Sequence, residues 1–473
     1  MERFKLKKGT LVVAALFLLT SGTIAQQVNS LSAKQAVEYA LKNSVDVKNS
    51  LLDIQIQQQT NREFTATAYP QINGKIGANY FPNIGVTALP NFISPATYGV
   101  LVQEGVKDGN GNPIVAPPLS DYGFINAQFG TKYSAQYGVD ISQILFDGQV
   151  FVGLQARSAL MDFAAKKTAV TEEAIKVNVL KIYYQLVVGA QQITTLDANI
   201  ERFEKLLNET KEIYKNGFAE KLDVDKVNVQ LSNLRTEKLR VQSTLAAGNA
   251  SLKFLMNMPQ KDSLILTDPL TDDDLKSNLL DTSYNYTDRK DFQMLEVGKQ
   301  LKEFNIKRYK LSYLPSVSLR GNYYRNAQRN SFSFFGVSPA GQPWFASSLI
   351  GLSINVPIFD GFAKAAQISK ANLELQQTNN SIEQLKASID NSVEQASLAL
   401  NASLITMDNQ RNNMELAEKV LNTTNKKYAQ GLGSNQEIYS AQTELKTAQN
   451  NYYGSLYDAV IAKIDFLRAR GKL

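Results

Sequence analysis

Four stretches of the chain alternate between apolar and polar residues with a period of two. In residues 71–80, Ile72 and Ile76 alternate with Asn73 and Lys75. The other three stretches are 132–142, 317–323 and 350–356. This period predicts β-strands with one apolar and one polar face. Each strand is about ten residues long, the length that a tilted strand needs to cross a bilayer. A soluble β-sandwich is the alternative, but the long helical stretch between the two predicted hairpins disfavours it.

Two loops join these strands in pairs. Residues 81–131 form a long loop rich in Gly, Pro and Asn, whereas 326–345 is shorter and contains Phe334, Phe335 and Trp344. Long loops on one side of a membrane sheet suit an extracellular face. Trp344 is a candidate interfacial anchor, although a single loop aromatic often has no such role.

Two other stretches lack the residues that break helices. Residues 149–214 contain no Pro and only Gly153 and Gly189, and residues 362–428 contain neither Pro nor Gly. Each stretch predicts one helix, and about 65 residues at 1.5 Å per residue reach on the order of 100 Å. Within the second, a 4-3-4-4-3 spacing typical of a coiled-coil seam runs through Ile389, Val393, Ala396, Leu400, Leu404 and Met407.

The chain is one unit built twice. Residues 145–148 read LFDG and residues 358–361 read IFDG, and similar segments flank both. The flanking pairs are 68–80 with 312–324 and 214–231 with 428–445. Each repeat reads helix, Pro, strand, loop, strand, Phe-Asp-Gly, long helix, Gly turn, helix, as an internal duplication predicts. The predicted divisions are 1–25 as a signal peptide, 26–256 as the first repeat, 257–291 as a connector and 292–473 as the second repeat.

Residues at the ends of the strands have predictable roles. The Asp of each tetrapeptide can cap the helix that follows, and the Gly allows a sharp turn. A Pro before each first strand ends the preceding helix. The predicted strand-to-helix joints are Asp147, Gly148, Asp360 and Gly361, and the helix-to-strand joints are Pro70 and Pro315.

The N-terminal residues and the composition narrow the class of protein. Four basic residues precede an apolar run at 11–19, and Thr-Ile-Ala at 23–25 completes the pattern of a secretory signal. Removing that segment takes away four basic residues and one acidic residue, which lowers the formal charge from +6 to +3, so the charge indicates no nucleic-acid partner. The absence of Cys excludes disulfides and argues against a lipoprotein. The absence of His excludes His-based nucleophile systems and His-ligated zinc, so we predict no enzyme, cofactor or metal.

No later stretch reaches 18 apolar residues, so the sequence predicts no transmembrane helix. A membrane location would then require a β-barrel. Four strands cannot close a barrel, so several copies of the chain would have to contribute strands. Three copies would give 12 strands, although this count does not follow from the sequence.

In this order the motifs resemble the TolC-like outer membrane efflux proteins, over nearly the whole chain after residue 25. The resemblance includes the opening helix at 31–48, both Pro-strand entries, both Phe-Asp-Gly joints, residues 288–296 and both Tyr-x-x-Gly turns. It implies an α+β membrane protein of a Gram-negative outer membrane: a homotrimer with a 12-stranded β-barrel that continues into a 12-helix periplasmic α-barrel. It also implies passive export, with a periplasmic adaptor (membrane fusion) protein and an inner-membrane transporter as partners.

The resemblance further implies a gate at the periplasmic helix tips. Its turns correspond to Gly217 and Gly431, and its gate residues to Tyr428, Asp223 and Glu437. The chain departs from the family pattern at three positions: Gly433 replaces a basic residue, Ser440 replaces an acid, and Lys290 replaces a Pro. The alternative is that the acidic residues form an ordinary solvated helix face.

Three other functions are alternatives to efflux. A type I secretion outlet for polypeptides uses the same architecture, and nothing in the sequence separates it from efflux. A coiled-coil structural or adhesive stalk is disfavoured by the amphipathic strands. A cation site at Asp272–Asp274 in the connector is less well supported than a solvated charge run.

Overall fold

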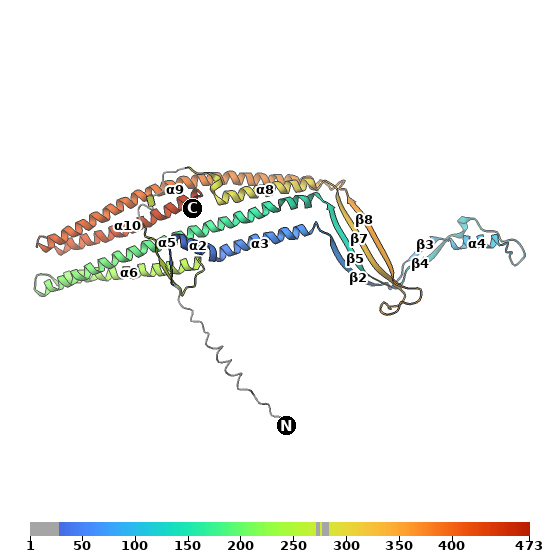
Figure 1. The fold of residues 1–473 in the computed structure, drawn as a ribbon, viewed down its shortest axis with the longest axis horizontal. Helices are drawn as coiled ribbons and strands as arrows, with labels where there is room; N and C mark the ends of the chain where they lie inside the picture. The colour runs from blue at the N-terminus through green and yellow to red at the C-terminus, as the bar shows by residue number, and fades with distance from the viewer. Residues whose placement is uncertain (1–27, 271–274, 277–282) are drawn as a thin grey trace, which may run out of the picture. The chain divides into compact units, whose positions relative to one another are not determined.

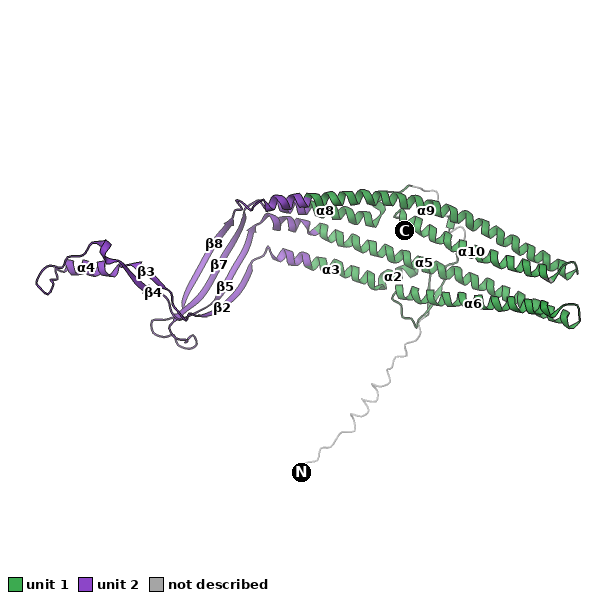
Figure 2. Ribbon diagram, turned by 180° about the vertical axis from the view of Figure 1, so that it is seen from behind, with its two compact units in different colours: residues 1–59, 158–303, 372–473 green, residues 60–157, 304–371 purple. Residues whose placement is uncertain are grey.

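The computed structural model describes residues 28–270, 275–276 and 283–473, so the predicted signal peptide and Asp272–Asp274 lie outside the described residues. The chain divides into two compact units, coloured separately in Figure 2. The helical unit contains residues up to Gln59, Ser158–Glu303 and Asn372–Leu473, and the strand unit contains Thr60–Arg157 and Phe304–Ala371. Each unit therefore draws on both sequence repeats.

The strand unit is built on one four-stranded antiparallel sheet. Its strands are β2 (Gln71–Tyr80), β5 (Tyr133–Phe146), β7 (Ser316–Arg329) and β8 (Phe345–Asn355). They lie side by side in the order β2-β5-β7-β8 (Figure 1). All four predicted strands are confirmed, and β5 and β7 are longer than their alternating patterns.

The strand register places the predicted apolar residues on one side of the sheet. Ile76 pairs with Tyr137, Tyr137 with Arg325, and Arg325 with Ala346, so these residues share a face. We call it the apolar face, and its larger members are Ile72, Ile76, Tyr80, Tyr133, Tyr137, Val139, Ile141, Val317, Leu319, Tyr323, Arg325, Arg329, Ile350, Leu352 and Ile354. Ile76 is 89% exposed and Ile350 is 84% exposed, so the middle of this face has no cover within the described chain, whereas Arg329 at its loop end is 0% exposed. The opposite, polar face carries mainly Asn, Gln, Ser, Gly and charged residues.

The segment 81–131 contains regular structure, so the prediction of a plain loop was wrong. It holds β3 (Val86–Pro90), α4 (Ile93–Gln103), the 3-10 helix η1 (Leu119–Tyr122) and β4 (Phe124–Gln128). β3 and β4 pair antiparallel as a separate two-stranded sheet. Each strand has only five residues, too few for a clear period in the sequence.

The helical unit is dominated by two antiparallel helical hairpins. One consists of α5 (Gly148–Lys215) and α6 (Lys221–Leu255), and the other of α9 (Ala363–Ala429) and α10 (Asn435–Ala469) (Figure 1). α5 and α9 are the two predicted long helices. Among the described residues, no helix has the length and hydropathy needed to span a membrane.

The predicted seam of α9 is buried within the helical unit. Ile389, Val393, Leu400, Leu404 and Met407 are each less than 9% exposed. Leu400 and Met407 pack in a cluster with α10 residues such as Leu456 and Val460. The coiled-coil spacing therefore marks the side of α9 that packs on its hairpin partner.

The N-terminal part of the helical unit differs from the predicted single opening helix. The chain forms α2 (Ala33–Asn43) and α3 (Val45–Ala66), which are separated at Ser44. Before them, β1 (Val28–Leu31) pairs in parallel with β6 (Ser263–Leu266). The Tyr183 hydroxyl donates to the Leu31 carbonyl oxygen at 3.0 Å, which ties β1 to the middle of α5.

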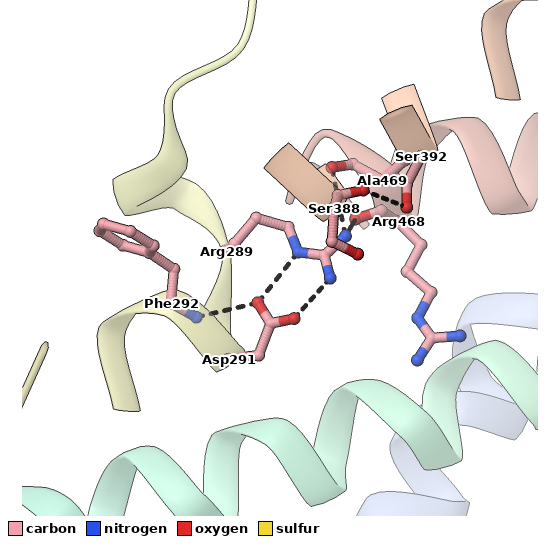
Figure 3. A network of polar contacts seen from close by, with 7 residues as sticks. All are labelled: Arg289, Asp291, Phe292, Ser388, Ser392, Arg468 and Ala469. Atoms are coloured by element: carbon pink, nitrogen blue, oxygen red, sulfur yellow. Dashed lines mark hydrogen bonds and ion pairs between the residues drawn. The ribbon is translucent and has the colours of Figure 1, made fainter. Parts of the chain in front are cut away.

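α8 (Lys290–Leu311) begins at the position where the family pattern has Pro. Figure 3 shows the polar network at this point, centred on Arg289. Its Nε and Nη2 donate to the two carboxylate oxygens of Asp291 at 3.0 and 2.6 Å, and Nη1 donates to the carbonyl oxygens of Arg468 and Ala469 at 3.2 Å. Burial opposes ionisation of Asp291, but the bonds from Arg289 outweigh it and lower the pKa of that carboxyl. Arg289 therefore links the start of α8 to the end of α10.

Candidate functional site at the helix tips

Both hairpins of the helical unit turn through the same backbone motif. Gly217 and Gly431 have φ values of +78° and +77°, a left-handed conformation that glycine adopts without strain. The next residues, Phe218 and Leu432, each donate their backbone N–H to the carbonyl oxygen five residues earlier at 3.0 Å. This is the Schellman motif, and its recurrence makes the two tips structural equivalents.

The same motif leaves one apolar side chain exposed at each tip. Phe218 is 86% exposed and Leu432 is 72% exposed. Neither residue is among those predicted from the sequence, although each directly follows the glycine of its Tyr-x-x-Gly turn. Each tip therefore exposes an apolar side chain to solvent at the same position.

Asp223 lies in the first turn of α6. Its Oδ2 accepts a hydrogen bond from the Glu220 backbone N–H at 3.2 Å, which helps to satisfy the free N–H groups of the helix start. Its carbonyl oxygen accepts a bond from the Tyr439 hydroxyl at 2.8 Å. The backbone of Asp223 is thus tied to α10, while its carboxylate stabilises its own helix.

Glu437 lies in the corresponding turn of α10. Ser434 caps this helix by accepting a bond from the Glu437 backbone N–H at 3.3 Å. The Glu437 carboxylate forms an exposed ion pair with Lys427 at 3.3 Å, a kind of contact that contributes little to stability. Tyr428, one residue after Lys427, is half-buried against the core shared by the two hairpins.

The two predicted acidic gate residues make no direct contact with each other. Within the described chain, no hydrogen bond or ion pair joins Asp223 to Glu437. The turn of α9 and α10 is tight, because a Cβ atom on Gly433 would lie 3.3 Å from the Tyr428 backbone nitrogen. A larger residue at position 433, such as the basic residue of the family pattern, would press on the end of α9.

Tyr439 is a residue of this site that the sequence did not indicate. Its ring is buried in the core between the hairpins, and its hydroxyl donates to Asp223 across them. Burial, followed by the nearby Asp223 carboxylate and Tyr428, raises its pKa to about 12. The hydroxyl therefore remains protonated and able to donate at neutral pH.

Further from the tips, polar side chains also link the two hairpins. Glu237 of α6 is 9% exposed, pairs with Lys446 of α10 at 2.5 Å and accepts a bond from Asn450 at 2.9 Å. Asn199 of α5 donates to Gln449 at 2.7 Å. Burial favours the neutral form of Glu237, but the bonds from Lys446 and Asn450 outweigh it and lower its pKa. These contacts and the apolar core hold the two hairpins against each other.

An open groove of about 1440 Å³ runs between α6, α9 and α10 near the tips. Asp225, Glu437 and Glu444 give it carboxylates, and Ser440 also lines it. Glu437 and Ser440, a position where the chain departs from the family pattern, therefore both line this groove. Asp223 does not line it. The groove can accommodate a polar or basic element.

The predicted joints lie in the strand unit. The Asp147 carboxylate accepts bonds from the backbone N–H groups of Gln149 and Val150 at 2.8 and 3.2 Å, and that of Asp360 accepts one from Lys364 at 3.0 Å. The two glycines differ: Gly361 has a φ of +65°, whereas Gly148 does not have a positive φ. A Cβ on Gly148 would instead lie 2.5 Å from the Leu311 carbonyl oxygen.

The two prolines lie directly before strands. Pro70 precedes β2 after a turn that follows the end of α3 at Ala66, and Pro315 precedes β7 after the end of α8 at Leu311. Both repeats therefore pass from helix to strand through a short turn that ends in Pro.

Comparison with known proteins links this architecture to a family. The family model described as outer membrane efflux protein matches residues 287–472. The chain is 19% identical over 343 residues to the outer membrane protein TolC of Vibrio cholerae, which covers 71% of this chain and 76% of that protein. It is 22% identical over 344 residues to protein CyaE of Bordetella pertussis, and this match covers 71% of this chain and 70% of that protein.

Solved structures share the fold over almost the whole chain. The structure of CusC aligns with a TM-score of 0.72 at 17% identity and covers 93% of this chain and 91% of that one. The Campylobacter jejuni CmeC outer membrane channel gives 0.69 at 15% identity, covering 93% and 85%. The outer membrane protein VceC of Vibrio cholerae gives 0.66 at 14%, covering 93% and 96%. These matches confirm the resemblance to the TolC-like outer membrane efflux proteins: the C-terminal part of the chain carries the family sequence pattern, and nearly all of it carries the fold of solved outer membrane channels.

Proposed function

We propose that this protein is the outer membrane channel of a tripartite efflux system, a passive duct that exports small molecules. The four-stranded sheet carries the proposal. Its apolar face is exposed, and its edge strands β2 and β8 have no partner strand among the described residues. An apolar surface on strands of this length suits lipid, and the polar face suits a water-filled lumen.

The open edges require other copies of the chain. Unpaired backbone groups at β2 and β8 would be costly in lipid, so each edge pairs with a neighbouring copy. In a homotrimer, which the family resemblance implies, three such sheets close a 12-stranded barrel in the outer membrane. The two helical hairpins of each copy then contribute to a 12-helix periplasmic barrel.

The helical hairpins direct the duct toward its partners. In this proposal their tips meet a periplasmic adaptor protein, which joins the channel to an inner-membrane transporter that supplies the energy. The match to a family of efflux proteins supports this role over a structural stalk. The proposal includes outer membrane lipid as a partner, but no nucleic acid, cofactor or catalytic step.

The gate belongs to the same proposal. Among the described residues, the exposed carboxylate of Glu437 is held only by a weak ion pair with Lys427, so it can present negative charge to a pore. Asp223 lies at the start of α6 and Tyr428 near the end of α9, and we assign all three residues to a cation-selective constriction. The constriction opens when the α9–α10 hairpin moves relative to the α5–α6 hairpin.

Single-channel conductance of the detergent-extracted protein in a planar bilayer tests the proposal. We expect small cation-preferring events whose preference falls in Asp223→Asn and Glu437→Gln. These substitutions remove charge but keep an acceptor, so the Asp223 bond to Glu220 can still form. Asp53→Asn, which removes an exposed carboxylate of α3 paired with Lys167, serves as the matched control and should leave the preference unchanged.

The outcomes separate the parts of the proposal. Insertion and conductance with unaltered selectivity in both gate variants would keep the channel and reject the gate assignment. A protein that remains soluble without detergent and never inserts would support the stalk instead.

A further inference from the structure

The loop end of the sheet, opposite the joints with α5 and α9, carries a cluster of aromatic rings. We call it the loop cluster, and it consists of Tyr133, Tyr137, Phe332, Phe334 and Trp344. Ring centroids lie 5.1 Å apart for Tyr137 and Trp344, and 6.1 Å apart for Phe334 and Trp344. Tyr133 and Tyr137 belong to the apolar face, so residues of the β7–β8 loop pack onto that face at its end.

Arg329, the last residue of β7, is enclosed by this cluster and is 0% exposed. Its guanidinium carbon lies 5.4 Å from the centre of the Phe334 ring and 6.0 Å from that of Trp344. Nη2 donates to the Ser338 hydroxyl at 2.9 Å, but Nε and Nη1 are buried and have no acceptor among the described residues. Aromatic stacking offsets part of the cost of burying this charge, but unpaired N–H groups remain costly.

The surrounding sequence supplies no counter-charge. Residues 312–359, which include β7, its loop and β8, contain Arg320, Arg325 and Arg329 but no Asp or Glu. Arg325 lies on the same face as Arg329, four residues earlier, and is half-buried. The carboxylate of β5, Asp140, belongs to the opposite, polar face. The apolar face thus carries two guanidinium groups at its loop end and needs an anion from outside the hairpin.

We propose that Arg329, assisted by Arg325, binds the phosphate of an anionic lipid in the outer leaflet of the membrane. This inference rests on the proposed function, because only a membrane channel places the apolar face against lipid and its loop end at the headgroups. Guanidinium groups match phosphate oxygens with paired hydrogen bonds, and aromatic rings favour the same interfacial depth.

Binding of a lipid phosphate requires the β7–β8 loop to move away from the Arg329 guanidinium. The Ser338 hydroxyl is the acceptor that a phosphate oxygen would replace at Nη2. The loop has glycines with positive φ on either side of this serine, Gly336 at +87° and Gly341 at +76°. The contact that must break joins the guanidinium to a neutral hydroxyl, whereas the contacts that form join it to an ionised phosphate and can be bidentate.

Trp344 provides a local signal, because it is the only tryptophan in the chain. The full-length protein in nonionic detergent is titrated with mixed micelles containing phosphatidic acid, or diacylglycerol as its phosphate-free counterpart. We expect a saturable change in tryptophan emission with phosphatidic acid only. Arg329→Gln should weaken the apparent affinity by on the order of tenfold or more, since it removes hydrogen bonds to a charged group. Arg320→Gln, on the opposite face of the same strand, should not.

Several results would overturn the inference. Equal responses to phosphatidic acid and diacylglycerol, or an Arg329→Gln affinity equal to wild type, would exclude a phosphate site at Arg329. The same response to inorganic phosphate alone would exclude the lipid as its source. If Arg329→Gln does not assemble, Arg329→Lys and Arg325→Gln take its place, and unaltered affinity in both would reject the site. If the protein conducts ions but shows no lipid response, only this inference is contradicted. If it neither inserts nor conducts, the proposed function is contradicted.

Discussion

At the scale of single residues, Gly148 and Gly361 show one sequence motif serving two physical needs. Gly361 provides a left-handed backbone, and an added Cβ there would have nothing within 4 Å. Gly148 allows the backbone to approach Leu311 closely, since a Cβ would lie 2.5 Å from the Leu311 carbonyl oxygen. The repeats therefore agree in sequence at a point where their local structures differ.

The same substitution at both glycines should have unequal effects. Asn tolerates the left-handed conformation, so Gly361→Asn should change the thermal unfolding midpoint little. Gly148→Asn must displace backbone and should destabilise the protein by about 1–3 kcal/mol. Thermal unfolding of the two variants in detergent checks this. Equal losses of stability would show that close approach at Gly148 is not the deciding constraint.

Glu237 makes stability depend on pH. Its folded-state pKa is lowered, so the pair with Lys446 stabilises the protein above the unfolded carboxyl pKa, and this contribution is lost as pH falls through the folded value. Glu237→Gln should lower stability at neutral pH by about 1–3 kcal/mol and reduce the further loss on acidification.

Unfolding midpoints measured from neutral pH to about pH 3 check this dependence. Glu204→Gln is the matched control, because Glu204 forms an exposed pair with Arg235. That variant should differ little from wild type at any pH. A parallel acid response in wild type and Glu237→Gln would count against the assignment.

At the scale of elements, the contacts between the α5–α6 and α9–α10 hairpins decide how easily one hairpin moves against the other. Near the tips, the bond from Tyr439 to the Asp223 carbonyl oxygen crosses between them. The larger apolar core around it is non-directional, so it resists separation more than sliding. The hydrogen bond is the contact that fixes the alignment at the tips.

Tyr439→Phe should therefore favour the open channel. Loss of one hydrogen bond removes about 1 kcal/mol, which corresponds to about a fivefold rise in the open-to-closed ratio. Single-channel recordings measure that ratio. Tyr183→Phe also removes a buried hydroxyl, one that bonds to Leu31 far along α5 from the turn, and should lower stability without changing conductance. If both variants open the channel equally, the tip bond has no special role.

The elements also show what the sequence can and cannot predict. A period of two predicted the main strands, because a ten-residue strand repeats its pattern several times. The near absence of Pro and Gly over about 65 residues predicted the two long helices. β1 and β6 have four residues each and pair only with each other, so neither has a readable period. Tyr439 and Arg329 were missed for a related reason: each acts through a partner or an enclosure that sequence spacing does not reveal. Phe218 and Leu432 could have been found, since they hold the same place in both repeats.

At the scale of the whole molecule, the edges of the four-stranded sheet determine the assembly. β2 and β8 are its outer strands, and β5 and β7 are its inner strands. A closed barrel requires β2 of one copy to lie beside β8 of the next, a pairing that a single chain does not contain.

Engineered cysteines can detect that pairing, because the chain has none of its own. Ala78→Cys on β2 combined with Ser348→Cys on β8 should cross-link between chains with a short bifunctional reagent, giving a ladder that ends at the trimer. Ala135→Cys combined with Ala327→Cys, which are paired on β5 and β7, should cross-link only within one chain. Denaturing electrophoresis separates the products. Only intrachain products from the edge pair would contradict barrel closure between copies.

The parallel pairing of β1 with β6 has a consequence for the order in which the protein is built. Val28 pairs with Ser263, so the first described strand has no partner until more than half of the chain has been synthesised and translocated. β5 and β7 are also far apart in sequence, with Tyr133 paired to Arg329. Contacts over such separations form slowly, and unpaired strands are prone to aggregation while they wait. The emerging chain therefore depends on being kept unfolded in transit, because β1 cannot pair until β6 has followed it across the membrane.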